Sequence, residues 1–290
     1  MRTIAFVTQK GGAGKSTLAL NLSVTAKHAG ERVVLLDLDP LQSLVKWAKL
    51  RENGDLPVEF VPAQKLQKTL ETLAKKGVSL VVLDAPGHDG AAQDAAIAAA
   101  DFIVIPARPN VFDLWASEVT RAKVKAQRKD YSFLLNQCPP AQQSGRVEQG
   151  AKALQAMGGL LSPMVSARVD FQEAARQGLG VSELRAPGEA AAEMRELWAS
   201  VKRRMKRAAK GESKSENRAE GKAAAAVSPQ DKPAAEAVAP AKPQDTTPAR
   251  TAKQPKVADK GEAKPAEKPQ AKATEKPVKA AVKLTVVKAA

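Results

Sequence analysis

The sequence predicts an α/β domain in which helices cover both faces of a mainly parallel central sheet, followed by a C-terminal tail outside this fold. Up to residue 207, short apolar runs rich in β-branched residues alternate with longer segments of helical periodicity. Strands that are separated by helices pair in parallel and become buried on both faces. Residues 208–290, in contrast, contain no aromatic residue and consist mainly of Ala, Lys, Pro, Glu and Gln. The predicted domain therefore comprises residues 1–207.

The alternation of the two patterns places each element. We expect strands at residues 2–8, 32–37, 58–61, 79–84, 101–106, 131–136 and 160–165. We expect helices at residues 15–29, 42–52, 63–76, 90–99, 112–129, 145–157, 170–177 and 188–207. In a sheet of this kind the ligand-binding loops follow the carboxyl ends of the strands.

The first strand leads into a glycine-rich loop with the sequence Q-K-G-G-A-G-K-S-T, which is followed by a helix. This is the context of a phosphate-binding P-loop, in which glycines let successive backbone N–H groups point at phosphate oxygens. Lys15 would reach the β- and γ-phosphates, and the Ser16 hydroxyl would coordinate Mg²⁺. Because Gln9 replaces the first glycine of the strict motif, the loop is a deviant Walker A sequence. The candidate nucleotide-binding residues are Lys10, Gly11, Gly12, Ala13, Gly14, Lys15, Ser16 and Thr17.

Aspartates close two further strands. Asp37 and Asp39 end the strand at residues 32–37, and Asp84 ends the strand at residues 79–84. An apolar strand that ends in Asp is the Walker B arrangement, in which the carboxylate holds Mg²⁺ through water. Asp39 and Asp84 are therefore candidate metal ligands beside Ser16. Asp37 fits a turn-capping role equally well.

Composition narrows the class of partner and the compartment. The chain has 46 Lys and Arg residues against 31 Asp and Glu residues, a net charge of +15, which favours a polyanion such as nucleic acid or an acidic membrane surface. Cys138 is the single cysteine, which excludes intramolecular disulfides and cysteine metal clusters within one chain. We identify neither a signal peptide nor a membrane-spanning run, and expect a cytoplasmic protein. Trp47, Trp115 and Trp198 are expected to pack in the core or at an interface.

The tail is too polar to form a core of its own. Its composition predicts a disordered, basic and partly extended segment. Val278, Val282 and Val286 follow an i, i+4 spacing near its end, which leaves a small amphipathic anchor within Val278–Ala290 as an alternative.

The loop with its second lysine, together with Asp37-Leu38-Asp39-Pro40 and Asp84-Ala85-Pro86, resembles the ParA/MinD family of deviant-Walker ATPases. The likeness covers about residues 1–205 and is greatest to the small ParA proteins of plasmid and chromosome partition. It implies a weak ATPase that uses Mg²⁺, forms an ATP sandwich homodimer and binds DNA non-specifically, with hydrolysis stimulated by a separately encoded ParB-like or cargo-adaptor protein. It also implies a nucleoid-associated location.

The resemblance assigns roles to individual residues. Lys10 corresponds to the lysine that reaches the phosphates bound by the partner subunit, so it counts with Lys15 and Asp39 as catalytic. Asp39 corresponds to the aspartate that positions the attacking water, and Asp84 to the Walker B residue. Asn136 resembles the residue that contacts adenine, although an Asn at a strand end is also an ordinary turn residue.

DNA binding is expected at two places. Arg168 lies in a segment, Ser166–Ala174, that resembles the region where partition ATPases place an arginine on DNA. The last helix ends in a run of basic residues that can track phosphates without reading bases, although a basic helix end is also favourable to the helix dipole. These candidates are Lys202, Arg203, Arg204, Lys206 and Arg207.

Some features depart from the family, and two other classes stay open. Leu41 stands where the family often has Gln, and with Tyr131 as the single tyrosine a tyrosine-rich kinase tail is excluded. A MinD-like membrane switch would use Val278–Ala290. An ATP-dependent ligase similar to dethiobiotin synthetase would need an additional substrate pocket and would not need Lys10. The cargo could be a plasmid, a chromosomal locus or a protein assembly.

Overall fold

The computed structural model describes residues 1–52, 54–139 and 145–209. Its last helix ends at Ala209, two residues beyond the predicted domain boundary. The predicted disordered tail after Ala209 and the segment Val278–Ala290 lie outside the described residues. The strands are β1 (Arg2–Phe6), β2 (Val33–Asp37), β3 (Val58–Phe60), β4 (Leu80–Asp84), β5 (Phe102–Ala107) and β6 (Tyr131–Leu135). The helices are α1 (Lys15–His28), α2 (Ser43–Ala48), α3 (Leu66–Lys75), α4 (Ala91–Ala99), α5 (Val111–Ala126), α6 (Gly145–Gly158), α7 (Val169–Arg176), α8 (Val181–Leu184) and α9 (Glu189–Ala209).

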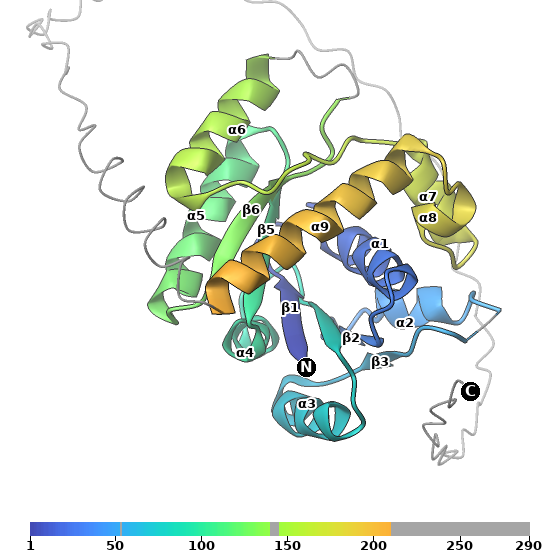
Figure 1. The fold of residues 1–290 in the computed structure, drawn as a ribbon. Helices are drawn as coiled ribbons and strands as arrows, with labels where there is room; N and C mark the ends of the chain where they lie inside the picture. The colour runs from blue at the N-terminus through green and yellow to red at the C-terminus, as the bar shows by residue number, and fades with distance from the viewer. Residues whose placement is uncertain (53, 140–144, 210–290) are drawn as a thin grey trace, which may run out of the picture. The chain divides into compact units, whose positions relative to one another are not determined.

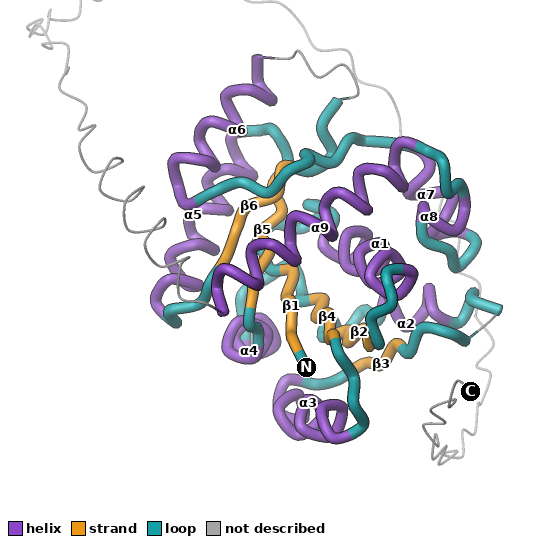
Figure 2. Tube along the Cα trace, in the orientation of Figure 1, coloured by secondary structure: helices purple, strands orange, loops and turns teal. Residues whose placement is uncertain are grey.

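The six strands form one sheet with the order β3-β2-β4-β1-β5-β6, and every pair is parallel. The predicted mainly parallel sheet is confirmed (Figures 1 and 2). Its register aligns Asp84 with Phe6 on one side and with Asp37 on the other. The acidic strand ends therefore lie beside the strand that enters the P-loop.

Alternate residues of each strand face opposite layers of helices. Ile4 and Phe6 pack in one apolar cluster with side chains of α1, α2, α7, α8 and α9, whereas Ala5 and Val7 pack in the other with side chains of α3, α4 and α6 and with Val124 of α5. Both faces of the sheet are thus covered, as Figure 1 shows.

The long helix α9 illustrates how sequence periodicity fixes this packing. Ala190, Met194, Leu197, Val201 and Met205 recur every three or four residues and are all buried against the layer that contains α1. Of the basic residues between them, Arg195 and Arg203 are exposed, whereas Arg204 is half-buried beside Gly159.

The predicted strand at residues 160–165 is wrong. This segment runs beside β6 and makes isolated bridges, Phe133 with Leu160 and Cys138 with Ser166. The amides of Leu161 and Val165 donate to Phe133 and Leu135, but Pro163 between them has no N–H to donate, so a continuous ladder does not form. The predicted helix at 42–52 is shorter, and α8 was not predicted.

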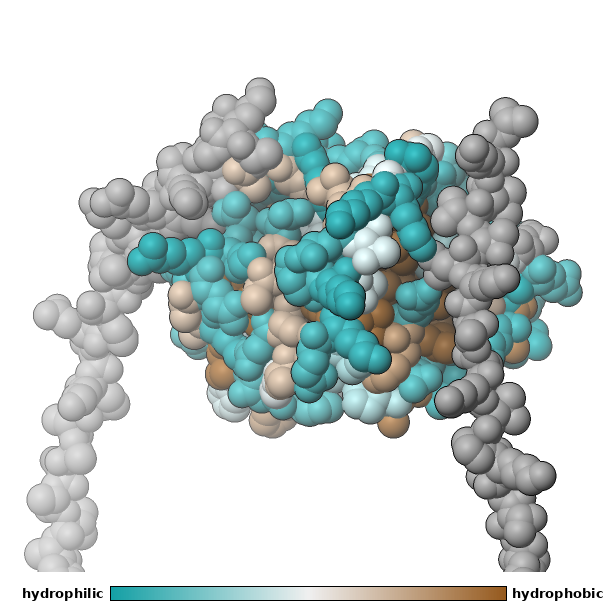
Figure 3. Space-filling model, turned by 90° about the horizontal axis from the view of Figure 1, so that it is seen from below, coloured by the Kyte–Doolittle hydropathy of each residue, from teal (hydrophilic) through white to brown (hydrophobic). Residues whose placement is uncertain are grey.

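The edge of the sheet at the amino ends of the strands faces the viewer in Figure 3, where hydrophilic side chains predominate and apolar ones are scattered. Among the helices of the described ranges, none has both the length and the apolar character that crossing a bilayer requires.

Candidate functional site

The loop between β1 and α1 has the backbone conformation of a phosphate cradle. Gly12 and Gly14 have φ angles of 77° and 88°, which residues with a side chain rarely adopt. A Cβ atom on Gly14 would also lie 2.3 Å from Asn136 Nδ2. Because α1 begins at Lys15, the free N–H groups of its first turn point into the loop.

Lys15 is buried at the base of this loop. Its ammonium donates to the Lys10 carbonyl at 3.3 Å. Burial lowers the pKa of Lys15, and the nearby carboxylates of Asp84 and Asp39 oppose that shift. A buried cation held between a glycine loop and two carboxylates is placed to bind a phosphate group.

Asp84, the predicted Walker B residue, is buried at the end of β4. Burial raises its pKa to about 7, whereas the Ser16 hydroxyl and the Lys15 ammonium favour the charged form. Its Oδ1 atom is buried and has no hydrogen-bond partner among the described residues. A carboxylate oxygen without a partner beside a serine hydroxyl is the donor set that Mg²⁺ uses, so Asp84 and Ser16 fit the ion that was predicted.

The burial of Asp84 predicts how the stability of the nucleotide-free, Mg²⁺-free protein depends on pH. The folded-state pKa of Asp84 lies above its unfolded value of about 4, so protonated Asp84 stabilises the fold at low pH and that stability is lost as the pH rises through 7. Asp84→Asn should therefore raise the free energy of unfolding at pH 8 by about 1–4 kcal/mol, and much less at pH 5. Thermal unfolding at both pH values measures this, with the exposed-site variant Glu71→Gln as control. An equal effect at both pH values would contradict the assignment.

Asp37 and Asp39 have different environments. Asp37 is fully buried, and its carboxylate accepts from the amides of Asp39, Leu44 and Val45 at 3.0, 2.9 and 3.4 Å. Of the two roles open for Asp37, the structure therefore supports the cap, here at the first turn of α2. Asp39 is half-buried and lines the cavity in front of the P-loop.

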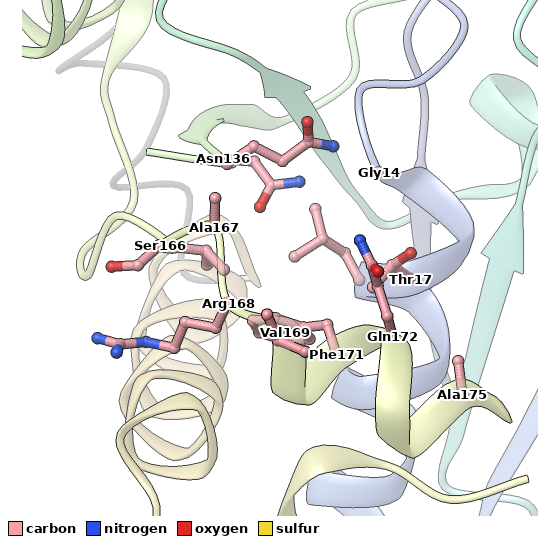
Figure 4. A pocket seen from close by; sticks show the side chains of 13 residues that line it. Gly14, Thr17, Asn136, Ser166, Ala167, Arg168, Val169, Phe171, Gln172 and Ala175 are labelled. Carbon is pink, nitrogen blue, oxygen red and sulfur yellow. The ribbon is translucent and has the colours of Figure 1, made fainter. Parts of the chain in front are cut away.

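Two adjoining cavities open on the P-loop. The first, of 780 Å³, is polar and is lined by Gly11, Gly12, Gly14, Lys15, Ser16, Thr17, Asp39, Pro40, Leu41, Ser43, Ala85, Gly87, His88 and Gln137. The second, of 510 Å³, is shown in Figure 4 and includes Leu18, Val165, Val169, Phe171 and Ala175. They share Gly14, Thr17 and Gln137. A charged cavity beside a more apolar one matches the phosphates and the base of a nucleotide.

Asn136 and its neighbour Gln137 brace the P-loop from the end of β6. Asn136 Nδ2 donates to the Ala13 carbonyl at 2.8 Å, and Gln137 Nε2 donates to the Gly12 carbonyl at 2.9 Å. Asn136 also lines the second cavity, where it was predicted to contact adenine. Gln137 was missed because a single amide at a strand end carries no distinctive sequence signal.

The segment Ser166–Ala174, which the sequence assigned to DNA binding, contributes six of its residues to the second cavity. Ser43 and His88 of the first cavity were also missed, because their place depends on how the loops after β2 and β4 fold against Gly11 and Lys15. A Cβ atom on Gly87 would lie 3.2 Å from Lys15 Nζ, which shows how closely the second of these loops approaches.

Lys10 differs from Lys15 in its burial, in its hydrogen bonding and in its position relative to the cavities. It is half-buried and lies outside both cavity linings. Across residues 1–52, 54–139 and 145–209, its ammonium has no ion pair or hydrogen bond, although its backbone carbonyl accepts from Lys15. Lys10 therefore lies beside the P-loop, but its side chain does not line the cavities of its own chain.

The structure does not bring the predicted DNA-binding residues together. Arg168 forms ion pairs with Glu189 and with Glu193, the latter at 3.0 Å, and its side chain is 21% exposed. Figure 4 shows that this side chain points away from Thr17. The basic residues Lys202 to Arg207 lie toward the other end of α9, about 14 to 21 Å along the helix from Glu193 at about 1.5 Å per residue.

Comparison with known protein families accounts for this geometry. Residues 4–181 match the model of the CobQ/CobB/MinD/ParA nucleotide-binding domain. The chain belongs to this family. Membership of the CobQ/CobB/MinD/ParA family confirms the predicted resemblance and identifies residues 4–181 as a nucleotide-binding domain.

Individual proteins are also similar to this chain in sequence. The maintenance of carboxysome distribution protein A of Halothiobacillus neapolitanus is 32% identical over 205 residues, which are 66% of this chain and 91% of the relative. The protein ParA of Rhizobium radiobacter is 34% identical over 118 residues, 39% of this chain and 51% of the relative.

Solved structures show the same fold. The apo McdA structure from Cyanothece has a TM-score of 0.59 and 18% identity, and it covers 71% of this chain and 99% of its own. MinD of Pyrococcus horikoshii complexed with Mg-ADP has a TM-score of 0.56 and 18% identity, with coverage of 69% and 95%.

Proposed function

We propose that this protein is an ATPase that forms a homodimer around two ATP molecules, binds DNA non-specifically in that state and positions a macromolecular cargo. A separately encoded ParB-like or adaptor protein stimulates hydrolysis and so releases the dimer from DNA. The observation that carries the proposal is Lys10, a second P-loop lysine that lies at the site but outside the cavity of its own chain.

Different residues of one chain bind different parts of the nucleotide. The P-loop N–H groups and Lys15 hold the phosphates, and the second cavity, with Asn136 at its edge, takes the base. Ser16 and Asp84, with Asp39 nearby, would hold Mg²⁺, which would neutralise charge on the phosphate oxygens. Asp39 orients the attacking water from the mouth of the cavity. These groups position and bind, which is the main protein contribution to phosphoryl transfer.

Lys10 supplies the remaining positive charge to the partner's site. A cation that is delivered in trans completes charge stabilisation only when two subunits dock, so hydrolysis depends on dimerisation. Lys10 is suited to this role because no carboxylate among the described residues pairs with its ammonium.

The basic end of α9 is the proposed DNA contact. Arg203, Lys206 and Arg207 are exposed there, and Lys202 lies over the Trp198 ring at 5.2 Å. With a net charge of +15, the chain attracts a phosphate backbone without reading bases. We place the ATPase domain at residues 1–207 and the protein in the cytoplasm, on the nucleoid.

Arg168 contributes to DNA binding only if its ion pairs open. Glu193→Gln removes one of the two ion pairs of Arg168 and should strengthen DNA binding by about 3- to 10-fold at low salt, because Arg168 then keeps Glu189 as its one carboxylate partner among the described residues and exchanges it more readily for phosphate. Glu196→Gln is the matched control: it removes the same charge from an exposed position on α9 without contacting Arg168. Duplex titration at several salt concentrations measures both, and equal effects of the two variants would show that Arg168 does not contact DNA.

The names of the relatives, and the share of their length that this chain covers, help to identify the class of cargo. The two relatives named maintenance of carboxysome distribution protein A are covered over 91% and 85% of their lengths, whereas the ParA protein of Rhizobium radiobacter is covered over 51%. This supports a protein assembly as cargo alongside a plasmid or a chromosomal locus. The membrane-switch alternative depends on Val278–Ala290, outside the described residues, and the part of the chain that the structure describes offers no observation that favours it.

The test is fluorescence anisotropy of a random-sequence duplex titrated with the full chain under ATP, ADP and no nucleotide. The proposal predicts tight binding with ATP alone, and weaker binding after replacement of Arg203, Lys206 and Arg207 by alanine. Equal binding under all three conditions would reduce the interaction to simple polycation attraction. No binding under any condition would contradict the DNA-carrier role.

A further inference from the structure

A cluster of exposed basic residues lies at the amino ends of the parallel strands. Arg2 is the first residue of β1, Arg32 directly precedes β2, and Lys75 and Lys76 lie at the end of α3. All four residues are exposed. We call this set the amino-edge patch: Arg2, Arg32, Lys75 and Lys76.

Contacts through Ser79 and Gly77 make the patch continuous. The Arg2 amide donates to the Ser79 carbonyl at 2.9 Å, and the Ser79 amide donates to the Arg32 carbonyl at 3.0 Å. The Arg32 guanidinium lies over Gly77, with its Nη2 atom 2.9 Å from the position of a Cβ atom on that glycine. Because Gly77 directly follows Lys76, the four cations lie along one part of this edge.

The charges of the patch are not neutralised within the domain. Across residues 1–52, 54–139 and 145–209, none of its four side chains forms an ion pair with a carboxylate. Two acids of the same edge are engaged by other groups. Glu31 Oε2 accepts from Ser79 Oγ at 2.6 Å. Asp101 Oδ2 accepts from the Thr3 amide at 2.8 Å. The positive charge of the patch is therefore available to an external anion.

The basic end of α9 reaches the same edge of the sheet. Arg204 Nη2 lies 3.1 Å from the position of a Cβ atom on Gly159, and the preceding Gly158 packs against Tyr131, the first residue of β6. Figure 1 shows the end of α9 and the N-terminus at the same end of the sheet. In the order β6-β5-β1-β4-β2, strand spacings of about 4.8 Å separate β6 from β2 by about 19 Å. That length of duplex DNA carries about 11 phosphate charges.

The patch is remote from the nucleotide site. The P-loop follows the carboxyl end of β1, whereas Arg2 stands at the amino end of the same strand. None of the four residues lines the 780 Å³ cavity or the 510 Å³ cavity. An anion that binds at the patch therefore does not compete with a nucleotide.

The surroundings of the patch favour a phosphate backbone over a protein partner. Figure 3 shows this edge of the sheet, where hydrophilic side chains predominate and apolar ones are scattered. The buried centre of a protein interface is mainly apolar and is depleted in lysine. Contact with phosphates needs only exposed Lys and Arg side chains, without an apolar anchor.

We propose that the amino-edge patch binds the phosphate backbone of duplex DNA in every nucleotide state of the protein. The inference rests on the proposed DNA-binding function and adds a second surface to the basic end of α9. A contact that ATP does not control keeps the protein loosely associated with DNA after hydrolysis, when the tight contact of the ATP state is lost. The protein then rebinds ATP close to the DNA that it has released.

The salt dependence of duplex binding by the full chain tests this surface. The patch variant combines four substitutions: Arg2→Gln, Arg32→Gln, Lys75→Gln and Lys76→Gln. The matched control removes the same charge from exposed positions on or next to α2, α5 and α6, by Lys46→Gln, Lys49→Gln, Lys125→Gln and Arg146→Gln. The residues after Ala209 are the same in both variants, so their contribution to DNA binding cancels in the comparison.

The patch variant should lose phosphate contacts in all nucleotide states. We expect the slope of the logarithm of the binding constant against the logarithm of salt concentration to become less negative by about 2–4, since each lost contact changes it by about 0.9. The change should be the same with a non-hydrolysable ATP analogue, with ADP and without nucleotide. The control variant should change the slope by less than half as much.

Three results would overturn the inference. Equal slopes for the patch and control variants would show that the patch is only a solvated surface. A change in slope that appears with the ATP analogue alone would contradict a contact in every nucleotide state. Unchanged DNA binding, with loss of binding to vesicles of phosphatidylglycerol and phosphatidylcholine, would assign the patch to a membrane surface.

The same titrations separate this inference from the proposed function. If the wild-type chain binds DNA equally with the ATP analogue and with ADP, the ATP-dependent switch of the proposed function is wrong. The patch contact is still supported in that case when the patch variant alone has the less negative slope.

Discussion

Lys10→Ala is expected to bind ATP with affinity within about twofold of the wild type, because its ammonium does not line the cavity of its own chain. ATP turnover in the presence of DNA should nevertheless fall by about 1,000-fold, the lower end of the effect of a cation supplied in trans. The reason is that each site loses the charge that stabilises the transferring phosphoryl group. Phosphate release and equilibrium binding of a fluorescent ATP analogue measure the two quantities.

The matched control for this variant is Lys46→Ala, which removes an exposed lysine from α2, the helix that follows the loop containing Asp39. It should change neither binding nor turnover. If Lys10→Ala turns over ATP at the wild-type rate, or if it loses ATP affinity instead, the assigned role of Lys10 is wrong.

Lys15→Ala is expected to weaken ATP binding by about 100-fold, since charge-assisted hydrogen bonds to phosphate contribute about 1.5–3 kcal/mol and the buried carboxylates of Asp84 and Asp39 would then face the phosphates without a counter-charge. Isothermal titration with ATP and Mg²⁺ measures this loss. The effect should exceed that of any other single lysine in the described ranges.

Lys68→Ala serves as control, because it removes an exposed lysine from α3. Thermal unfolding shows whether Lys15→Ala remains folded, and loss of its buried charge is not expected to unfold the protein. Unchanged ATP affinity in folded Lys15→Ala would contradict the assignment of the P-loop as the phosphate-binding site.

Local patterns in the sequence predict the fold and the inner part of the site. Buried strands in a parallel sheet read as continuous apolar runs, so β1, β2, β4 and β6 were located to within a residue or two. The glycine loop and the strand-ending aspartates are short motifs whose chemistry depends on adjacent residues. They could be assigned before any contact was known.

Other features depend on contacts between distant residues. Arg168 reads as a free cation, but Glu189 and Glu193 on α9 pair with it. The segment 160–165 has the composition of a strand, yet Pro163 interrupts its pairing with β6. Helix α5 buries the polar residues Asp113 and Thr120. The sequence does not predict this burial, because it depends on the contacts of these residues with Arg108 and Gln9.

The central claim is that Lys10 acts on the nucleotide of the partner subunit, and mixing two inactive variants tests it most directly. Asp39→Ala lacks the residue that we propose orients the water but keeps Lys10, and it should accumulate as an ATP-bound dimer. Lys10→Ala lacks only the lysine. In a mixed dimer, the site on the Lys10→Ala subunit contains Asp39 and receives Lys10 from its partner.

We predict that an equimolar mixture regains about a quarter of wild-type ATP turnover, since about half of the dimers are mixed and each has one complete site. If Lys10 acts within its own chain, no subunit in the mixture has both groups. Turnover of the mixture at the level of the separate variants, with mixed dimers shown to form, would contradict the account.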